Sequence, residues 1–85
     1  MKTLENYKNE NEAGEWIEDV YSTTVGELEE FGHGWDFLGK YDSEDEIKIK
    51  ITNSNGRLEA TWMDNFDSSV LDIETAIETI NGLNL

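Results

Sequence analysis

Two alternating runs, with an Asn-Gly pair between them, constrain the fold of this chain more than any other feature. Apolar and polar residues alternate from position 47 to 52 and again from position 58 to 63. The apolar members are Ile47, Ile49, Ile51, Leu58, Ala60 and Trp62. A period of two is typical of half-buried strands, and Asn55-Gly56 tolerates the positive φ angles of a tight turn. The sequence therefore predicts an antiparallel hairpin that turns at Asn55-Gly56.

A short helix is predicted upstream of this hairpin. Thr24 and Glu27 have the spacing of a capping box, in which each residue satisfies a free backbone N–H of the first helical turn. Apolar residues then follow at helical spacing until Gly32, a residue type that commonly ends helices. We expect a helix over residues 25–31.

A second helix is predicted at the C-terminal end. Ser69 and Asp72 offer a possible capping pair, and Gly82 offers a stop. Between them the apolar residues recur at helical spacing, which predicts a helix over 69–81. Its buried face would consist of Val70, Ile73, Ile77 and Ile80.

Three other stretches carry less regular patterns. Residues 15–21 contain two apolar pairs four positions apart, which favours a helical stripe, although the same residue types also suit a strand. Residues 35–41 follow a glycine-rich loop and are expected to form a first strand. Residues 1–14 are mostly polar, and we expect them to be frayed or weakly docked.

These elements together predict one small α+β domain over residues 1–85. It would contain N-terminal helical elements, an antiparallel three-stranded meander and a C-terminal helix packed on one face of the sheet. A chain of 85 residues leaves no room for a second domain of ordinary size.

Net charge narrows the possible functions. The chain carries 20 acidic and 6 basic residues, a formal net charge of −14. Nucleic-acid binding needs clustered Lys and Arg, and anionic membranes attract the same residues, so neither partner is expected. With three Trp, three Tyr and three Phe, the chain has the large apolar side chains that disordered acidic chains lack. The sequence contains no cysteine and no apparent export or membrane segment, so we expect the protein to be in the cytoplasm.

Catalysis and metal binding find little support in the sequence. The single histidine, His33, stands between two glycines, and no cysteine is present. The carboxylates are expected to be exposed, whereas acid–base catalysis needs one of them raised in pKa by burial. An EF-hand counted from Asp42 would require glycine and glutamate where Ile47 and Asn53 stand. We therefore expect neither enzymatic activity nor a metal or cofactor.

The excess of acidic residues is concentrated in the first half of the chain. Residues 1–46 contain 14 of the 20 acids and only 3 of the 6 bases. Solubility of a small domain needs a net charge of only about 2 to 8 in magnitude, and a larger charge opposes compaction. The excess therefore suggests a binding role for a basic partner.

The candidate contact residues fall into two groups. The first consists of Asp42, Glu44, Asp45 and Glu46, at the turn that enters the best-defined strand. The second consists of Glu29, Glu30 and Asp36, with Trp35 as an aromatic anchor. For Trp35 a position in the core is the favoured alternative.

In size, charge, lack of cysteine and α+β plan, the chain resembles the small acidic inhibitors of phages and mobile elements. These are anti-CRISPR and anti-restriction proteins, some of which mimic DNA. The resemblance covers the whole chain without a diagnostic motif. It implies stoichiometric inhibition of a basic nucleic-acid-binding protein, such as a nuclease or a CRISPR effector. A toxin-immunity protein or antitoxin fits equally, as does an acidic adaptor that binds through an apolar patch.

Overall fold

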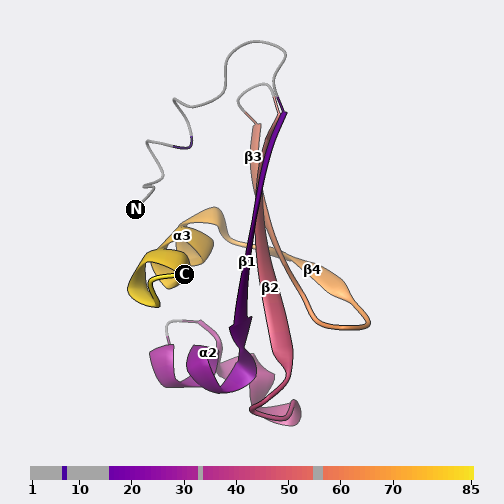
Figure 1. Cartoon of the computed structure of the whole chain (residues 1–85), viewed down its shortest axis with the longest axis vertical. Coiled ribbons are helices and arrows are strands. Elements are labelled where there is room, and N and C mark those ends of the chain that lie inside the picture. Colours follow the sequence, from indigo (N-terminus) through magenta and orange to yellow (C-terminus); the bar gives the residue numbers. More distant parts are fainter. Residues whose placement is uncertain (1–6, 8–15, 33, 55–56) are drawn as a thin grey trace.

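The computed structural model describes residue 7 and residues 16–32, 34–54 and 57–85. The fold is α+β, with a four-stranded antiparallel sheet and two α-helices, one of them C-terminal (Figure 1). The elements in chain order are β1 (Trp16–Thr24), α2 (Val25–Phe31), the 3-10 helix η1 (Asp36–Lys40), β2 (Glu46–Ser54), β3 (Arg57–Met63), β4 (Ser68–Leu71) and α3 (Ile73–Gly82).

The strands form a simple meander in the order β1-β2-β3-β4. The predicted hairpin strands are confirmed as β2 and β3, which pair from Lys48 opposite Met63 to Ser54 opposite Arg57. The predicted turn residues, Asn55-Gly56, lie outside the described residues. One further strand pairs with each side of this hairpin, β1 with β2 and β4 with β3. The sheet therefore has four strands in place of the three expected.

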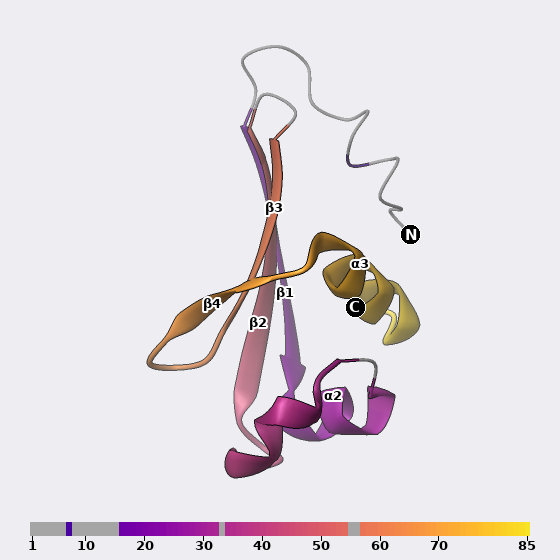
Figure 2. The same ribbon diagram turned by 180° about the vertical axis from the view of Figure 1, so that it is seen from behind.

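The helices α2, η1 and α3 lie on one side of the sheet, which we call the covered face (Figures 1 and 2). The alternation of β2 explains this arrangement, because Ile47, Ile49 and Ile51 are buried whereas Lys48 lies exposed on the opposite side. The core between sheet and helices consists of Tyr7, Val25, Leu28, Trp35, Leu38, Ile47, Ile49, Ile51, Ala60, Ala76, Ile77 and Ile80. The opposite side, the open face, has no helix over it in the described part of the chain.

Helix α2 confirms the predicted bounds and the Thr24 half of the predicted capping box, whereas Glu27 bonds to a side chain and not to the N-cap backbone. The Thr24 side chain accepts a hydrogen bond from the backbone N–H of Glu27, at 3.3 Å. The Glu27 carboxylate in turn accepts from the Thr23 hydroxyl, 2.6 Å away. At the other end Gly32 has a φ of 75°, a conformation that favours glycine. The local sequence thus sets both ends of this helix.

The helical interpretation of residues 15–21 is wrong, because residues 16–24 form strand β1. β1 pairs with β2 over its whole length, from Trp16 opposite Ser54 to Thr24 opposite Glu46. In a strand, Ile17 and Tyr21 share the covered face while Val20 faces the open side, so the apolar pairs do not form one stripe. Pairing with the free edge of β2 decides the structure here, despite the helical spacing of the apolar residues. The strand was the alternative that these residue types also suited.

The strand expected at 35–41 is also wrong. Residues 36–40 form η1, in which Leu38 is fully buried and Phe37 is half exposed. Trp35, Leu38 and Tyr41 are spaced by three, and this period matches one face of a 3-10 helix. The spacing of three was therefore the informative pattern in this stretch.

The C-terminal helix begins four residues later than predicted. Asp72 is its N-cap, with its side chain accepting from the Thr75 N–H at 3.2 Å, and the helix runs to Gly82. The preceding residues instead form β4, in which Val70 lies opposite Thr61 and is 88 % exposed. Val70 is therefore not a core residue, whereas Ile77 and Ile80 are.

Candidate functional site

The acidic turn between η1 and β2 is fixed by backbone hydrogen bonds to α2. The first two N–H groups of α2 donate into this turn, Val25 to the Asp45 carbonyl at 3.0 Å and Gly26 to the Ser43 carbonyl at 2.9 Å. A Cβ on Gly26 would lie 3.2 Å from the Ser43 carbonyl oxygen, so glycine permits this close approach. The turn thus satisfies two of the four N–H groups that a helix start leaves free.

Within the turn, two hydrogen bonds join Asp42 and Asp45. The Asp45 N–H donates to the Asp42 carbonyl at 3.0 Å, and the Asp42 N–H donates to the Asp45 carboxylate at 3.2 Å. The side chains of Asp42 and Glu44 are exposed, and Asp45 is half-buried. Acidic residues therefore occupy a rigid turn, which presents them without a large ordering cost.

A second acidic turn, between β3 and β4, is organised by Asp64. Its carboxylate accepts hydrogen bonds from the backbone N–H groups of Phe66 and Asp67, both at 2.7 Å. Its own N–H donates to the Asp67 carbonyl at 3.0 Å. The N–H of Asp67, then that of Phe66, hold the pKa of Asp64 below its usual value, because they stabilise the ionised form.

The fold brings the two acidic turns together around Tyr41. Tyr41, Asp45 and Glu46 line a small hollow together with Asp64, Asn65 and Phe66. The neighbouring Asp64 carboxylate raises the pKa of Tyr41, because it disfavours the ionised phenol. We call the combined set the acidic rim: Asp42, Glu44, Asp45, Glu46, Asp64 and Asp67.

Cations do not neutralise most of this rim. Close ion pairs join Lys48 to Glu46 at 3.9 Å, Lys50 to Glu18 at 3.9 Å, and Arg57 to Glu59 at 3.2 Å. All six of these side chains belong to the open face of the sheet. Of the rim acids only Glu46 takes part, and no Lys or Arg of the described residues lies within 4 Å of the other five carboxylates.

The second group of predicted contact residues lies on α2 and η1. Glu29, Glu30 and Asp36 are all exposed. Glu30 lines a hollow with Phe31 and Leu83, on the side of α2 that meets α3. The structure thus brings the first group of predicted acids together with the second turn, and it does not place Glu30 among them.

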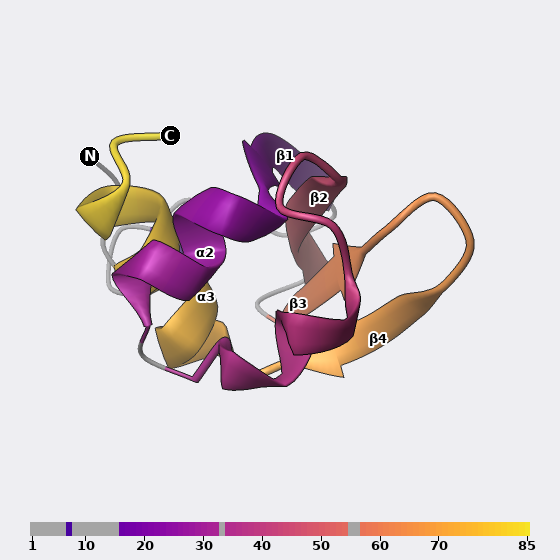
Figure 3. The same ribbon diagram turned by 90° about the horizontal axis from the view of Figure 1, so that it is seen from below.

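Trp35 belongs to the core and not to a contact surface. Its side chain is fully buried, and its indole N–H donates to the Thr79 hydroxyl at 2.9 Å. The exposed aromatic residue beside the rim is instead Phe66, which is 90 % exposed and lies in the connection between β3 and β4. That connection projects away from the helices (Figure 3). A phenylalanine between Asp64 and Asp67 in a turn-like stretch was the sequence signal for this site, and sequence reasoning did not use it.

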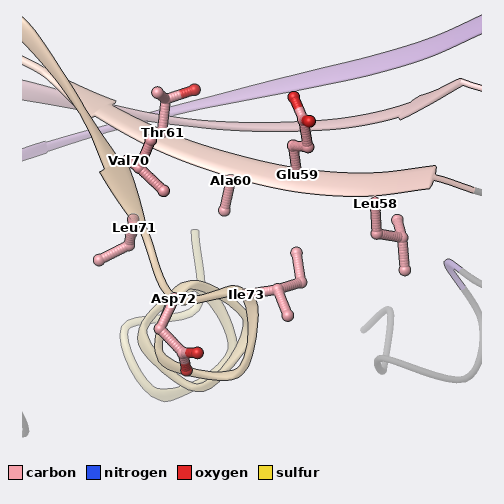
Figure 4. Close-up of a pocket in the computed structure, with 8 residues that line it drawn as sticks. All are labelled: Leu58, Glu59, Ala60, Thr61, Val70, Leu71, Asp72 and Ile73. Atoms are coloured by element: carbon pink, nitrogen blue, oxygen red, sulfur yellow. The ribbon is translucent and has the colours of Figure 1, made fainter.

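Another hollow lies where β4 leaves the sheet and α3 begins (Figure 4). Leu58 and Ala60 point toward Ile73 across this space, while Glu59 and Thr61 point to the other side of β3. Its volume is about 380 Å³, and its inner wall is apolar. No set of convergent polar groups suggests a chemical role for it.

The described residues contain neither a candidate metal site nor a helix that could span a membrane. No three His, Asp or Glu side chains among residues 7, 16–32, 34–54 and 57–85 are grouped so that they could hold a metal ion. No helix in that part of the chain has the length and apolar character needed to cross a membrane. His33 lies outside the described residues, as do residues 1–14 other than the buried Tyr7.

Comparison with known proteins gives no relative. No family model, no curated protein sequence and no solved structure matches this chain. Any function must therefore be argued from the molecule itself.

Proposed function

We propose that this chain is a stoichiometric inhibitor that occupies the basic nucleic-acid-binding groove of another protein. The acidic rim would take the place of nucleic-acid phosphates in that groove. The partner would be a nuclease or another nucleic-acid-handling protein, as the resemblance to anti-CRISPR and anti-restriction inhibitors implies. A toxin-immunity role against a basic nuclease uses the same surface.

One observation carries this proposal: two turns with six carboxylates between them meet at one hollow, which Asp45, Glu46 and Asp64 line. Five of the six have no Lys or Arg of the described residues within 4 Å. Like charges on neighbouring turns raise the free energy of the folded state, and here backbone hydrogen bonds fix the turns in place. A basic groove would relieve that repulsion on binding and would steer the two proteins together.

Phe66 adds an apolar element to this charged surface. Charge alone gives fast association but modest affinity, whereas buried aromatic residues at the centre of an interface supply much of the binding energy. Phe66 is exposed beside Asp64 and Asp67 and would become buried in the complex. We therefore assign it the anchoring role that the sequence offered to Trp35.

An adaptor that binds through an apolar patch is the second candidate. The open face carries Val70 and Val20, 88 % and 51 % exposed, in one cross-strand row with Lys50 and Thr61 between them. Two valines separated by polar residues make a small patch compared with known docking surfaces. Complexes formed there would depend weakly on salt, whereas groove occupancy would weaken steeply with it.

The test is competition on a captured partner. The tagged protein would be used to isolate its partner from host lysate at low salt, and the purified complex would be challenged with double-stranded DNA or guide RNA. We expect nucleic acid to displace the inhibitor and higher salt to weaken the complex. A complex that is indifferent to saturating nucleic acid would contradict groove occupancy.

A pair of charge-matched variants localises the contact. The rim variant combines Asp42→Lys and Glu44→Lys with Asp45→Asn and Glu46→Gln; Asn at 45 retains the acceptor that holds the turn. The control variant changes net charge equally, on other elements, and consists of Glu74→Lys, Glu78→Lys, Glu18→Gln and Glu59→Gln. We expect the rim variant to lose at least tenfold in affinity and the control much less. Equal losses would mean that net charge matters and the rim does not.

A further inference from the structure

A second hollow, next to the rim, combines aromatic rings with a carboxylate. It is about 450 Å³ in volume and lies where η1 meets the ends of β3 and β4. The residues that line it are Phe37, Lys40, Tyr41, Trp62, Asp67, Ser68 and Ser69. Asp67 belongs also to the acidic rim, so the hollow and the rim form one continuous surface.

Three aromatic rings form the apolar wall of this hollow. Trp62 is central, with its ring centroid 5.4 Å from that of Phe37 and 6.4 Å from that of Tyr41. The Tyr41 and Trp62 planes are nearly perpendicular, at 89°. Trp62 also packs edge-on against the buried Trp35, at 6.3 Å, so the wall is supported from the core. Phe37 is nevertheless 50 % exposed, more than a core ring would be.

The electrostatics of the hollow favour a cation. Asp67 lines it directly, and Asp64, which lines the neighbouring hollow together with Tyr41, adds a second negative charge at its edge. The faces of aromatic rings attract positive charge. An anion would meet two carboxylates here, and a neutral apolar group would leave Asp67 desolvated and unpaired.

The chain already places one of its own cations at this site. The Lys40 ammonium lies over the Tyr41 ring, 5.4 Å from its centroid. This contact shows that the ring face accepts a cation. Lys40 is exposed and its side chain is long, so an incoming cation can displace it at small cost.

We propose that this hollow binds the guanidinium group of an arginine side chain supplied by the partner. A planar guanidinium stacks on aromatic faces and pairs with a carboxylate through parallel N–H groups, which a lysine ammonium does not do. Basic nucleic-acid grooves are rich in arginine, so the identity of the donor rests on the proposed function. Recognition of the cation itself does not, and it can be tested with the isolated protein.

The experiment is an NMR titration of the ¹⁵N-labelled full chain with N-acetyl-arginine amide, with the neutral citrulline analogue as the control ligand. We expect shifts in the backbone amides of residues 37–41 and 67–69 with the arginine ligand, and none with citrulline. Equal shifts with both ligands, or shifts spread over all acidic residues, would overturn the proposal.

Three variants sharpen the result. Phe37→Ala should weaken binding about two- to fivefold, the loss expected for one exposed cation–π contact. Val20→Ala shortens an apolar side chain of similar exposure, 51 %, on β1 outside the hollow and should leave the affinity unchanged. Lys40→Gln should tighten binding about two- to fivefold, because it removes the competing cation.

The opposite response to Lys40→Gln would identify a different site. If that substitution weakened binding, and inorganic phosphate shifted the same amides, the hollow would be an anion site held by Lys40. A negative titration would reject the arginine site and leave groove occupancy by the acidic rim to be judged by nucleic-acid competition. A positive titration with no displacement by nucleic acid would support the arginine site and contradict groove occupancy.

Discussion

The polar groups on the covered face of the sheet differ from those of the acidic rim in charge and in hydrogen bonding. On the covered face, two hydrogen bonds join neutral side chains, one from the Trp35 indole to the Thr79 hydroxyl and one between the Tyr7 and Tyr21 hydroxyls. At the rim, polar groups are ionised, and the backbone holds them in place, as the N–H groups around Asp64 do. The same short chain thus contains a neutral, closed network and a charged, open one.

This difference teaches that the fold does not need most of its charge. The covered face stabilises the domain through apolar burial and satisfied hydrogen bonds, and losing one of its members leaves a cavity or an unpaired polar group. In the rim, Asp45 and Asp64 accept backbone hydrogen bonds, and Glu46 pairs with Lys48. The side chains of Asp42, Glu44 and Asp67 take part in no hydrogen bond or ion pair among the described residues. Truncating side chains of the covered face and neutralising these three acids should therefore change stability in opposite directions.

The largest effect should come from Tyr7→Ala. The Tyr7 ring is almost fully buried, its hydroxyl bonds to that of Tyr21 at 2.9 Å, and its carbonyl accepts from the Asn53 amide at 2.7 Å. Truncating a buried aromatic ring costs about 3 to 5 kcal/mol, which is a large share of the stability of a small domain. Chemical denaturation of the variant should show a midpoint far below that of the parent.

Tyr7→Phe is the matched control, since it removes only the hydroxyl and should cost about 1 kcal/mol. Burial, followed by the bond to Tyr21, raises the pKa of Tyr7 above its usual range. A raised pKa means that the contribution of the hydroxyl is complete below about pH 10, the unfolded value, and is lost as the pH rises further. The parent should therefore lose its advantage over Tyr7→Phe in strongly alkaline solution. An advantage that persists there would contradict the assignment.

The next effect should come from Thr79→Val, which keeps the shape of the side chain and removes its hydroxyl. That hydroxyl accepts from the Trp35 indole at 2.9 Å and donates to the Thr75 carbonyl at 2.7 Å. A buried donor left unpaired costs about 1 to 3 kcal/mol. Thermal unfolding would measure the loss, and Thr75→Val, on the same helix, provides a control. Equal stability of the parent and Thr79→Val would mean that water or another group satisfies the indole.

Sequence reasoning succeeded where local chemistry determines the structure. The alternation around Ile49 and the Thr24–Glu27 pair are complete within a few residues, so β2, β3 and α2 could be predicted. It failed where a distant partner decides. Residues 16–24 become a strand because β2 has a free edge, and Val70 joins β4 because the turn at Asp64 returns the chain along β3.

The candidate site shows the same division. The acids from Asp42 to Glu46 were recognised because they are adjacent in sequence. Asp64 and Asp67 are some twenty residues further on in the sequence, and only the fold places Asp64 in one hollow with Asp45 and Tyr41. The choice between Trp35 and Phe66 as the exposed aromatic depends on burial, which a single sequence pattern did not reveal.

A smaller effect, of opposite sign, is expected when the rim is neutralised. The double variant Asp42→Asn, Glu44→Gln should be more stable than the parent by about 0.5 kcal/mol at low salt, because both side chains are exposed and surrounded by like charge. The parent itself should melt at a higher temperature in moderate salt than in low salt. The gain from the double variant should shrink as salt is added.

The matched control for that variant is Lys48→Gln, Lys50→Gln on the open face. These lysines pair with Glu46 and Glu18, so removing them should destabilise the protein at low salt. If neutralising rim acids and neutralising open-face lysines changed the melting temperature in the same direction, repulsion at the rim would not be the cause. A melting temperature that falls with salt would mean that the acids are mostly paired.

The smallest effect distinguishes Asp64 from the other rim acids. Asp64→Asn keeps an oxygen that can accept from Phe66 and Asp67 but removes the charge that strengthens both bonds. The pKa of Asp64 is lowered in the fold, so its charge contributes stability that is present above the unfolded value, near pH 4, and lost as the pH falls through the folded value. At neutral pH, Asp64→Asn should therefore melt slightly below the parent, although it removes one repelling charge, and the gap should close in acid. Asp42→Asn, whose carboxylate holds no turn, should melt slightly above the parent at neutral pH. Melting curves from pH 7 to pH 3 would measure both differences, and an Asp64→Asn that is more stable than the parent at pH 7 would make Asp64 an ordinary member of the rim.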